Sequence, residues 1–270
     1  MTAAVKTIVH PITGKTFKLG RRRPLVRPEF FFARAMLPTF PAAPPGPLGY
    51  PTKAVACLNQ IYGNDILGDC TAAGAFHING ALLANAGEVV NFTESDVIAF
   101  YAGSCGYVPG NEATDQGGDE QTVLNYWKQN GLVSGLHKID GWSGVDGSNA
   151  AEVRSATWLF ENCYFGIELP DAWINPMPSI SGFVWDVAGD PDPDNGHCFV
   201  GLDYTDQGVV IDSWGMLGTI TWAAIAKYAS IPLGGELYTV FGPDAINTAT
   251  LKAPNGFNGA QLTSDLGGFA

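Results

Sequence analysis

The sequence predicts an α+β fold in which a helical half is followed by a half built mainly of antiparallel strands. Two observations lead to this prediction. Up to about residue 162, segments with helical character begin at good N-terminal capping residues, and after Tyr164 the apolar pattern changes to a period of two. A chain that segregates its helices from its strands in this way is expected to form two packed halves with a cleft between them.

Four helices are expected in the first half, over residues 70–86, 93–102, 119–130 and 148–162. The first follows a loop rich in Gly, Asn and Asp and begins at Cys70. Thr93 or Ser95 is a suitable N-cap for the second, and Asp119 is one for the third, which Gly131 would end. Ser148 with Glu152 is expected to open the fourth.

Four strands are expected in the second half, over residues 164–169, 197–204, 209–212 and 236–241, with a short helix over 221–228. The second and third strands read as a hairpin, because a turn sequence at 206–208 separates two runs of alternating apolar residues. This hairpin would place His197, near the start of one strand, beside Asp212, near the end of the next.

The length and composition suit one large domain carrying extended ends. The chain has 270 residues, of which 46% are hydrophobic, enough for a substantial core. We expect an extended basic Pro-rich arm over residues 1–51, a compact domain over 52–246 and an extended tail over 247–270. The phenylalanines at 30–32 and 40 should lie on a surface, either that of this domain or that of a neighbouring subunit.

Charge is divided unevenly between the arm and the remainder. The whole chain has a formal net charge of −12, yet residues 1–34 carry eight basic side chains against Glu29 alone. An acidic body disfavours nucleic acid as a partner. The arm is expected either to lie on an acidic surface or to remain a solvated tail. No signal-like or membrane-spanning apolar run is present, which predicts a cytoplasmic or virion location.

Cys70, His197 and Asp212 form a candidate catalytic triad. The N-terminus of a helix favours a thiolate, which would make Cys70 a nucleophile. His197 would act as its base, and Asp212 would orient the imidazole. A lone cysteine at a helix start is more often a packing residue, so the hypothesis depends on the three residues together.

The motifs around these residues resemble those of the papain-like cysteine peptidases. That family has a Gln six residues before the helix-capping Cys, a distant His that opens a strand, and Asn-Ser-Trp-Gly on the next strand. Here Asn64 precedes Cys70 by six residues, His197 opens the expected strand, and residues 212–215 read Asp-Ser-Trp-Gly. The resemblance covers residues 57–242. It implies that Asn64 and the Cys70 backbone N–H bind the oxyanion, although Asn is one methylene shorter than Gln, and that Trp214 shields the histidine.

A set of phage and prophage proteins of this fold shows a closer likeness. They share an Asn-Asp-x-x-Gly-Asp-Cys stretch, matched at 64–70, a basic N-terminal motif, matched at 18–24, and a late Trp-Gly, matched at 214–215. This likeness implies a virion context. We therefore predict a papain-like cysteine hydrolase, a thiol protease of peptide or amide bonds, that needs no cofactor or metal. The alternative is a non-catalytic virion or capsid decoration protein that binds capsid or tail subunits through its arms.

Three further features have simpler readings. The alternating acids at 190–196 read as a solvated turn rather than a calcium loop, because the required Gly and Glu are misplaced. His77 lies seven residues after Cys70 on the same helix and is expected to be a packed or surface histidine rather than a metal ligand. The remaining four cysteines are expected to be buried thiols, and one disulfide among them is the alternative.

Overall fold

A seven-stranded mixed sheet and a layer of helices form the body of the molecule, in a computed structural model that describes residues 5–26, 42–89 and 91–256. The strand order is β3-β9-β4-β6-β7-β8-β5, and each neighbouring pair is antiparallel except β5 with β8. The strands are β3 (Gly141–Gly144), β4 (Cys163–Glu168), β5 (Phe183–Trp185), β6 (Gly196–Tyr204), β7 (Gly208–Ser213), β8 (Met216–Thr221) and β9 (Glu236–Phe241).

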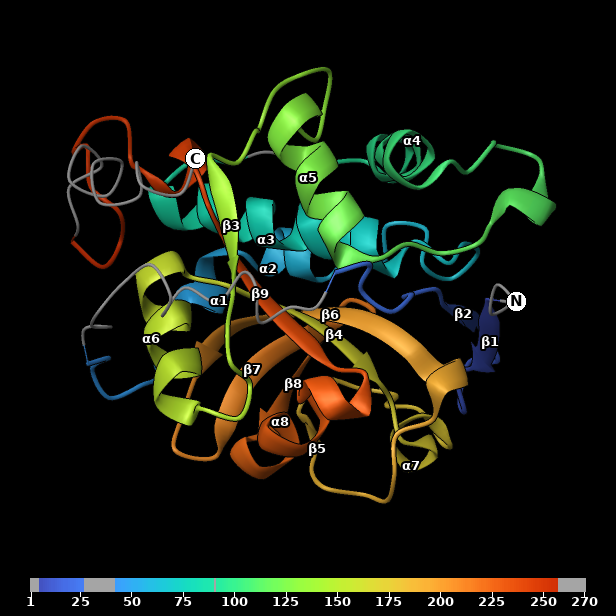
Figure 1. Ribbon diagram of the computed structural model, residues 1–270. Helices are drawn as coiled ribbons and strands as arrows, with labels where there is room; N and C mark the ends of the chain where they lie inside the picture. Colours follow the sequence, from blue (N-terminus) through green and yellow to red (C-terminus); the bar gives the residue numbers. More distant parts are fainter. Residues whose placement is uncertain (1–4, 27–41, 90, 257–270) are drawn as a thin grey trace.

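The helices fall into two groups around this sheet. In Figure 1, the longer helices α3 (Cys70–Ala86), α4 (Glu94–Cys105) and α5 (Glu120–Asn130) form the upper half. The sheet forms the lower half with α6 (Ala150–Phe160), α7 (Asp171–Ile174) and α8 (Trp222–Tyr228), while α1 (Tyr50–Lys53) and α2 (Val55–Leu58) lie near the boundary. The predicted arrangement of a helical half on a mainly antiparallel half is confirmed.

Helix α3 is the centre of the helical half, because nearly all its residues are buried. Its small side chains allow close packing on all sides. A Cβ at Gly74 would come within 2.7 Å of the Tyr164 ring and 3.2 Å of the Cys198 sulfur, so α3 approaches the sheet at this point. Strand β6 is its main partner in the sheet, which places the N-terminus of α3 beside the strand that carries His197.

Local capping chemistry sets the starts of the other long helices. The Thr93 side chain accepts a hydrogen bond from the backbone of Asp96 and completes a capping box at α4. Asp119 caps α5, as predicted. Helix α6 is capped by Asn149 rather than Ser148, because the Asn149 side chain accepts from the backbone N–H groups at the helix start.

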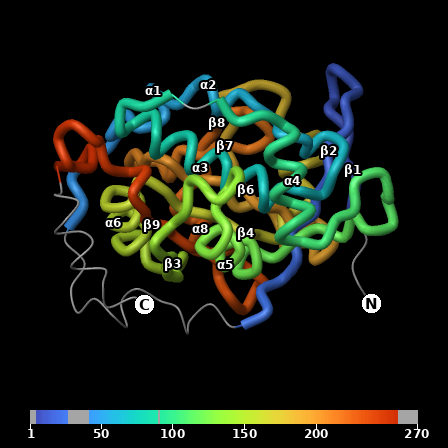
Figure 2. Tube along the Cα trace, turned by 90° about the horizontal axis from the view of Figure 1, so that it is seen from above, coloured from blue at the N-terminus to red at the C-terminus, as the bar shows by residue number. Residues whose placement is uncertain are grey.

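The described part of the N-terminal arm contains a hairpin that the proline-rich pattern did not predict. Strand β1 (Lys6–Val9) pairs with β2 (Thr16–Leu19), shown in blue at the boundary between the two halves in Figure 1 and at the edge of the molecule in Figure 2. Several basic side chains of this segment pair with acids of the body: Lys15 with Asp65, Lys18 with Asp115, Arg21 with Glu120 and Glu236, and Arg23 with Glu168. This part of the arm therefore covers an acidic surface of the same chain rather than one of a neighbouring subunit.

Several predictions fall partly or wholly outside the described residues. The phenylalanines at 30–32 and 40 and the end of the tail, 257–270, lie there. All five cysteines are described and are free thiols. Within the described ranges, no helix is long and apolar enough to cross a membrane.

Candidate active site

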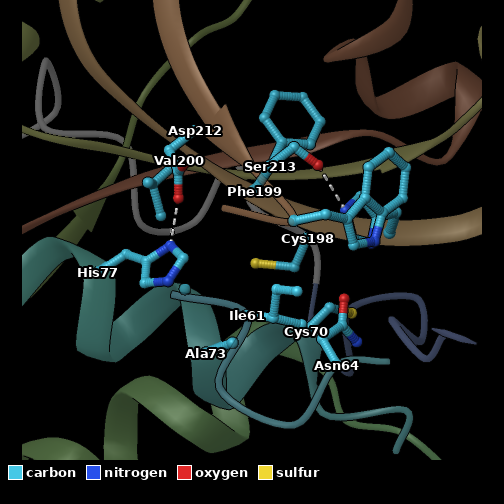
Figure 3. A pocket seen from close by; sticks show the side chains of 13 residues that line it. Ile61, Asn64, Cys70, Ala73, His77, Cys198, Phe199, Val200, Asp212 and Ser213 are labelled. Atoms are coloured by element: carbon cyan, nitrogen blue, oxygen red, sulfur yellow. Dashed lines mark hydrogen bonds and ion pairs between the residues drawn. The ribbon is translucent and has the colours of Figure 1, made fainter. Parts of the chain in front are cut away.

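A small cavity between the two halves is lined by all four predicted site residues. Asn64 and Cys70 reach it from the helical side, and Asp212 reaches it from β7 (Figure 3). His197 lines it from β6. Its volume is about 20 Å³, enough for about one water molecule. In the part of the chain that the structure covers, no cluster of three His, Cys, Asp or Glu side chains is arranged to hold a metal ion.

Cys70 is the first residue of α3, as predicted, but its surroundings oppose the expected thiolate. The side chain is almost fully buried, with the residue 2% exposed. Burial raises the pKa of the thiol to about 12, and backbone hydrogen bonds from Cys198 and Gly20 to the sulfur lower the pKa only in part. Desolvation therefore outweighs the helix N-terminus, and Cys70 is a neutral thiol at pH 7.

His197 lies on β6 with one ring face covered by Trp214, since the ring centroids are 4.3 Å apart and the rings are nearly parallel. Its Nε2 atom lies 3.0 Å from the Ser213 hydroxyl oxygen. The Nδ1 atom is buried and has no hydrogen-bond partner among the described residues. Burial lowers the pKa of His197 to about 3. The imidazole is therefore neutral, and no thiolate–imidazolium pair is present.

Asp212 lines the same cavity, but its carboxylate forms an ion pair with Nδ1 of His77 (Figure 3). The strand register accounts for this pairing. Val200 is paired with Asp212 across the β6–β7 ladder, and side chains alternate along a strand. Asp212 therefore points to the same face as Val200, toward α3. His197 lies an odd number of positions from Val200, so its side chain points to the opposite face, where it contacts Ser213. The structure brings the Asp212 carboxylate to His77 instead of to His197.

His77 is the site residue that the sequence reading assigned to packing. It lies two turns after Cys70 on α3, is 4% exposed, and packs its ring against Tyr62 at 4.9 Å between centroids. Its Nε2 atom is buried without a hydrogen-bond partner in the described residues. Burial raises the pKa of Asp212, and the interaction with His77 opposes this rise. The spacing of seven residues from Cys70 was the only sequence signal for this position.

Asn64 is already engaged by the N-terminal arm. Its amide nitrogen donates to the backbone oxygens of Lys18 and Leu67, both at 3.1 Å. The Lys18 backbone N–H in turn donates to the Asn64 backbone oxygen at 2.9 Å. An amide in this arrangement has both hydrogens in use. The arm segment over residues 16–23, here called the strap, therefore occupies the donor that the resemblance assigns to an oxyanion.

The strap continues past Cys70 through main-chain contacts with both halves. The Gly118 N–H donates to the Gly20 oxygen at 2.9 Å, and the Arg22 N–H donates to the Gly118 oxygen at 2.8 Å. On the sheet side, the Arg21 N–H donates to the Gly196 oxygen at 3.0 Å. The strap is thus held like an extended peptide in a channel between the two halves, defined by its contacts with Asn64, Cys70, Gly118 and Gly196. This channel was not predicted.

Alkylation of Cys70 is expected to be slow at neutral pH and to accelerate with rising pH. Since its pKa is about 12, the thiolate at pH 7 should be about a thousandfold rarer than for an ordinary cysteine. The rate of iodoacetamide modification, followed by mass spectrometry of the Cys70 peptide, should rise about tenfold per pH unit between pH 7 and 10. A rate that is already maximal at pH 6 would contradict this burial-dominated thiol.

Comparison with known proteins identifies the fold. No protein-family model matches the sequence, and no curated protein sequence matches it. Solved structures do match. Xylellain, a cysteine protease from Xylella fastidiosa, is 11% identical, with a TM-score of 0.55 over 83% of this chain and 96% of that chain. The digestive procathepsin L2 proteinase of Tenebrio molitor larval midgut is 13% identical, with a TM-score of 0.55 over 88% of this chain and 84% of that chain.

A third match has the same character. The Amb a 11 cysteine protease, a major ragweed pollen allergen in its proform, is 15% identical, with a TM-score of 0.54 over 82% of this chain and 71% of that chain. At such identities the likeness concerns the fold. The chain therefore has the papain-like α+β fold of these cysteine proteases, as its sequence motifs predict.

Proposed function

We propose that this protein is a cysteine hydrolase that cleaves peptide or related amide bonds. The observation that carries the proposal is the meeting of Cys70 and His197 at one cavity, from the start of α3 and from β6, within a fold shared with cysteine proteases. A thiol and an imidazole at the junction of two halves are the groups that nucleophilic attack on an amide requires.

Each predicted residue has a role in the proposed reaction. Cys70 gives its proton to His197 and attacks the carbonyl carbon, and His197 then returns the proton to the leaving amine. Water hydrolyses the resulting thioester and restores the thiol. Asp212 orients His197 and stabilises its cation, and Asn64 with the Cys70 N–H binds the oxyanion.

The described conformation must open before this reaction can occur. The strap holds the Asn64 amide through Lys18, and His77 holds the Asp212 carboxylate. Departure of the strap would free the Asn64 amide and admit water to the buried thiol and imidazole. The working triad further requires Asp212 or His197 to change its side-chain orientation, because the two lie on opposite faces of the hairpin.

A peptide-cleavage assay tests the proposal. The full chain is incubated with a mixed peptide library, and new termini are identified by mass spectrometry. Cleavage that disappears in Cys70→Ala, and in wild type that has first been alkylated with iodoacetamide at pH 10, where the modification of Cys70 is fastest, is the expected result. The matched control is Cys163→Ala, which removes another buried thiol that does not line the cavity. Cleavage that persists in Cys70→Ala would contradict the proposed nucleophile.

The closed site also supports a second candidate, a non-catalytic protein of the same fold. In this reading the strap is a permanent part of the core, and the chain binds neighbouring subunits through the remaining parts of its arms, as a virion structural or capsid decoration protein does. The neutral Cys70 and His197, both almost fully buried, favour it. No cleavage by wild type, together with co-purification of the chain with phage capsid or tail subunits, would select this candidate.

A further inference from the structure

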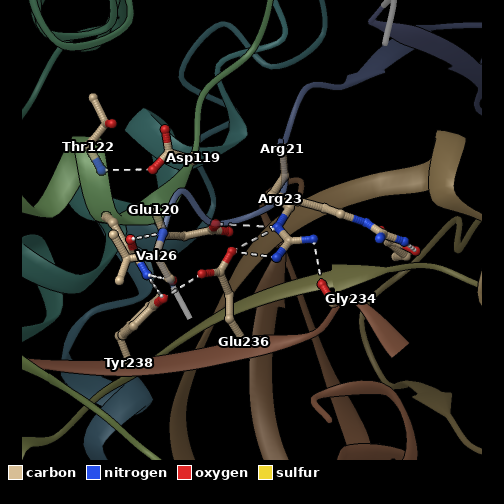
Figure 4. A network of polar contacts seen from close by, with 11 residues as sticks. Arg21, Arg23, Val26, Asp119, Glu120, Thr122, Gly234, Glu236 and Tyr238 are labelled. Carbon is tan, nitrogen blue, oxygen red and sulfur yellow. Dashed lines mark hydrogen bonds and ion pairs between the residues drawn. The ribbon is translucent and has the colours of Figure 1, made fainter. Parts of the chain in front are cut away.

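The Arg21 side chain is fully buried in an acidic pocket of the body (Figure 4). Its Nε atom donates to Glu236 at 3.1 Å and to Glu120 at 3.3 Å, and Nη2 donates to Glu236. Its Nη1 atom donates to the backbone oxygen of Gly234 at 2.9 Å. All three nitrogens of the guanidinium are therefore bound, a pattern that distinguishes Arg from other cations.

The pocket belongs to the body and is held by the body's own contacts. Glu120 is the first residue of α5 and Glu236 the first of β9. The Tyr238 hydroxyl donates to Glu236 at 2.5 Å (Figure 4). It also accepts from the Gln121 amide at 2.8 Å. Two buried carboxylates thus face one guanidinium, and the pocket without Arg21 would leave their oxygens and the Gly234 carbonyl without these donors.

Two glycines make room for the occupant. A Cβ at Gly166 would lie 2.8 Å from the Arg21 Nε atom, and one at Gly196 would overlap the Arg21 backbone oxygen. The walls of the channel are therefore shaped around an extended backbone and an arginine side chain. Replacement of a buried ion triad by well-packed apolar residues of similar size is often neutral or stabilising. Stability alone gives no reason for this pocket, whereas recognition of a guanidinium does.

We propose that the pocket of Glu120, Glu236 and the Gly234 carbonyl is a binding site for one arginine side chain of an extended peptide, and that the strap is its resident occupant. The inference names the substrate class of the proposed hydrolase, and it rests on that function because the same channel passes Cys70. A peptide that replaces the strap would place its arginine in this pocket and its backbone against Gly118 and Gly196.

A peptide-binding experiment on the full chain tests the proposal. The Arg21→Ala chain leaves the pocket without its guanidinium. A fluorescein-labelled peptide of residues 15–25 is titrated with this chain and followed by anisotropy, alongside two variants of the peptide, Arg21→Ala and Arg22→Ala. These two variants have the same net charge, which controls for attraction to the acidic body. We expect the Arg21→Ala peptide to bind at least about tenfold more weakly than the Arg22→Ala peptide.

Two further chains keep the result interpretable. Arg21→Lys retains the buried cation and serves if Arg21→Ala does not fold. In this chain the tethered strap competes with the added peptide for the pocket at an effective concentration of about 1 mM. Both peptides should therefore bind more weakly, but the Arg22→Ala peptide should still bind more tightly than the Arg21→Ala peptide. Adding Glu236→Gln to either chain should reduce the preference for the Arg22→Ala peptide. Equal binding of the two peptides, or no binding to either chain, would overturn the proposal.

Binding and cleavage are separate readouts in this design. A peptide that binds through its arginine and is not cut supports the pocket while contradicting the hydrolase. A peptide library that is cut in a Cys70-dependent way without any preference for arginine supports the hydrolase while contradicting the pocket.

Discussion

Arg21→Ala is expected to lower the free energy of unfolding by about 3–5 kcal/mol, because it leaves the buried carboxylates of Glu120 and Glu236 without their cation. In the intact protein, burial alone would lower the pKa of the guanidinium, but the charges of Glu236 and Glu120 outweigh burial and raise it. The same attraction is what the substitution removes. Denaturant unfolding at pH 7, followed by circular dichroism, measures the loss.

The loss should depend on pH with a definite sign. Burial raises the pKa of Glu120 well above its usual value of 4.5, the charge of Glu236 raises it further, and Arg21 opposes the rise. In the intact protein Glu120 already holds its proton above about pH 4.5, where the unfolded chain releases it, and removal of Arg21 raises the folded-state pKa of Glu120 further. The contribution of Glu120 to stability therefore falls in both chains as pH rises above about 4.5 toward the folded-state pKa. The deficit of the variant relative to wild type should be smallest below the raised pKa of the intact protein and should grow as pH rises through it.

Arg23→Ala provides the matched control within the strap. Its guanidinium also contacts a carboxylate, that of Glu168, at 2.5 and 3.0 Å, but its side chain is 63% exposed. Solvent screens the Arg23 side of this pair, although the Glu168 side chain is only 3% exposed, so the expected loss is about 1–2 kcal/mol, smaller than for Arg21. Equal losses for the two arginines would mean that burial is not the source of the Arg21 effect.

Local signals in the sequence were sufficient for the longer elements. Thr93 and Asp119 have side chains that accept hydrogen bonds from the first turn, and they mark the starts of α4 and α5 at the predicted residues. The short elements gave weaker signals. Strand β3 reads Gly-Trp-Ser-Gly and becomes a strand only by pairing with β9. Its two glycines favour a turn in isolation. The pairing with β9, which is distant in the sequence, therefore determines this strand.

The sequence motifs indicated which residues line the candidate site, but not which of their side chains contact one another. Asn64, Cys70, His197 and Asp212 line one cavity because the motifs fix their places in the loop before α3, at the start of α3 and on the hairpin. The partners of Asp212 and His197 depend on strand register, and a shift of one residue changes the face of every side chain. The position of the strap could not be predicted for another reason. Its contacts with Cys70 and Glu236 join residues that are far apart in the sequence, and no local pattern encodes such contacts.

His197→Ala is expected to reduce kcat/KM for peptide cleavage by about 10⁴-fold, because the proposed thiol then has no base. The Arg21→Lys chain, in which the strap is loosened, is a suitable background for the measurement. His137→Ala is the matched control, since this imidazole also pairs with a carboxylate, that of Asp244 at 2.8 Å, and does not line the cavity. It should leave kcat/KM within about threefold of the background.

His77→Ala then decides which imidazole is the base. In the proposed reaction Asp212 must serve His197, and His77 only holds that carboxylate in the closed structure. Removal of His77 should therefore change kcat/KM by no more than about tenfold, whereas Asp212→Asn should cost about 10²-fold or more. The opposite outcome is a loss in kcat/KM of about 10⁴-fold for both His77→Ala and Asp212→Asn, with little loss for His197→Ala. In that case the His77–Asp212 pair is the working dyad, and the proposed role of His197 is wrong.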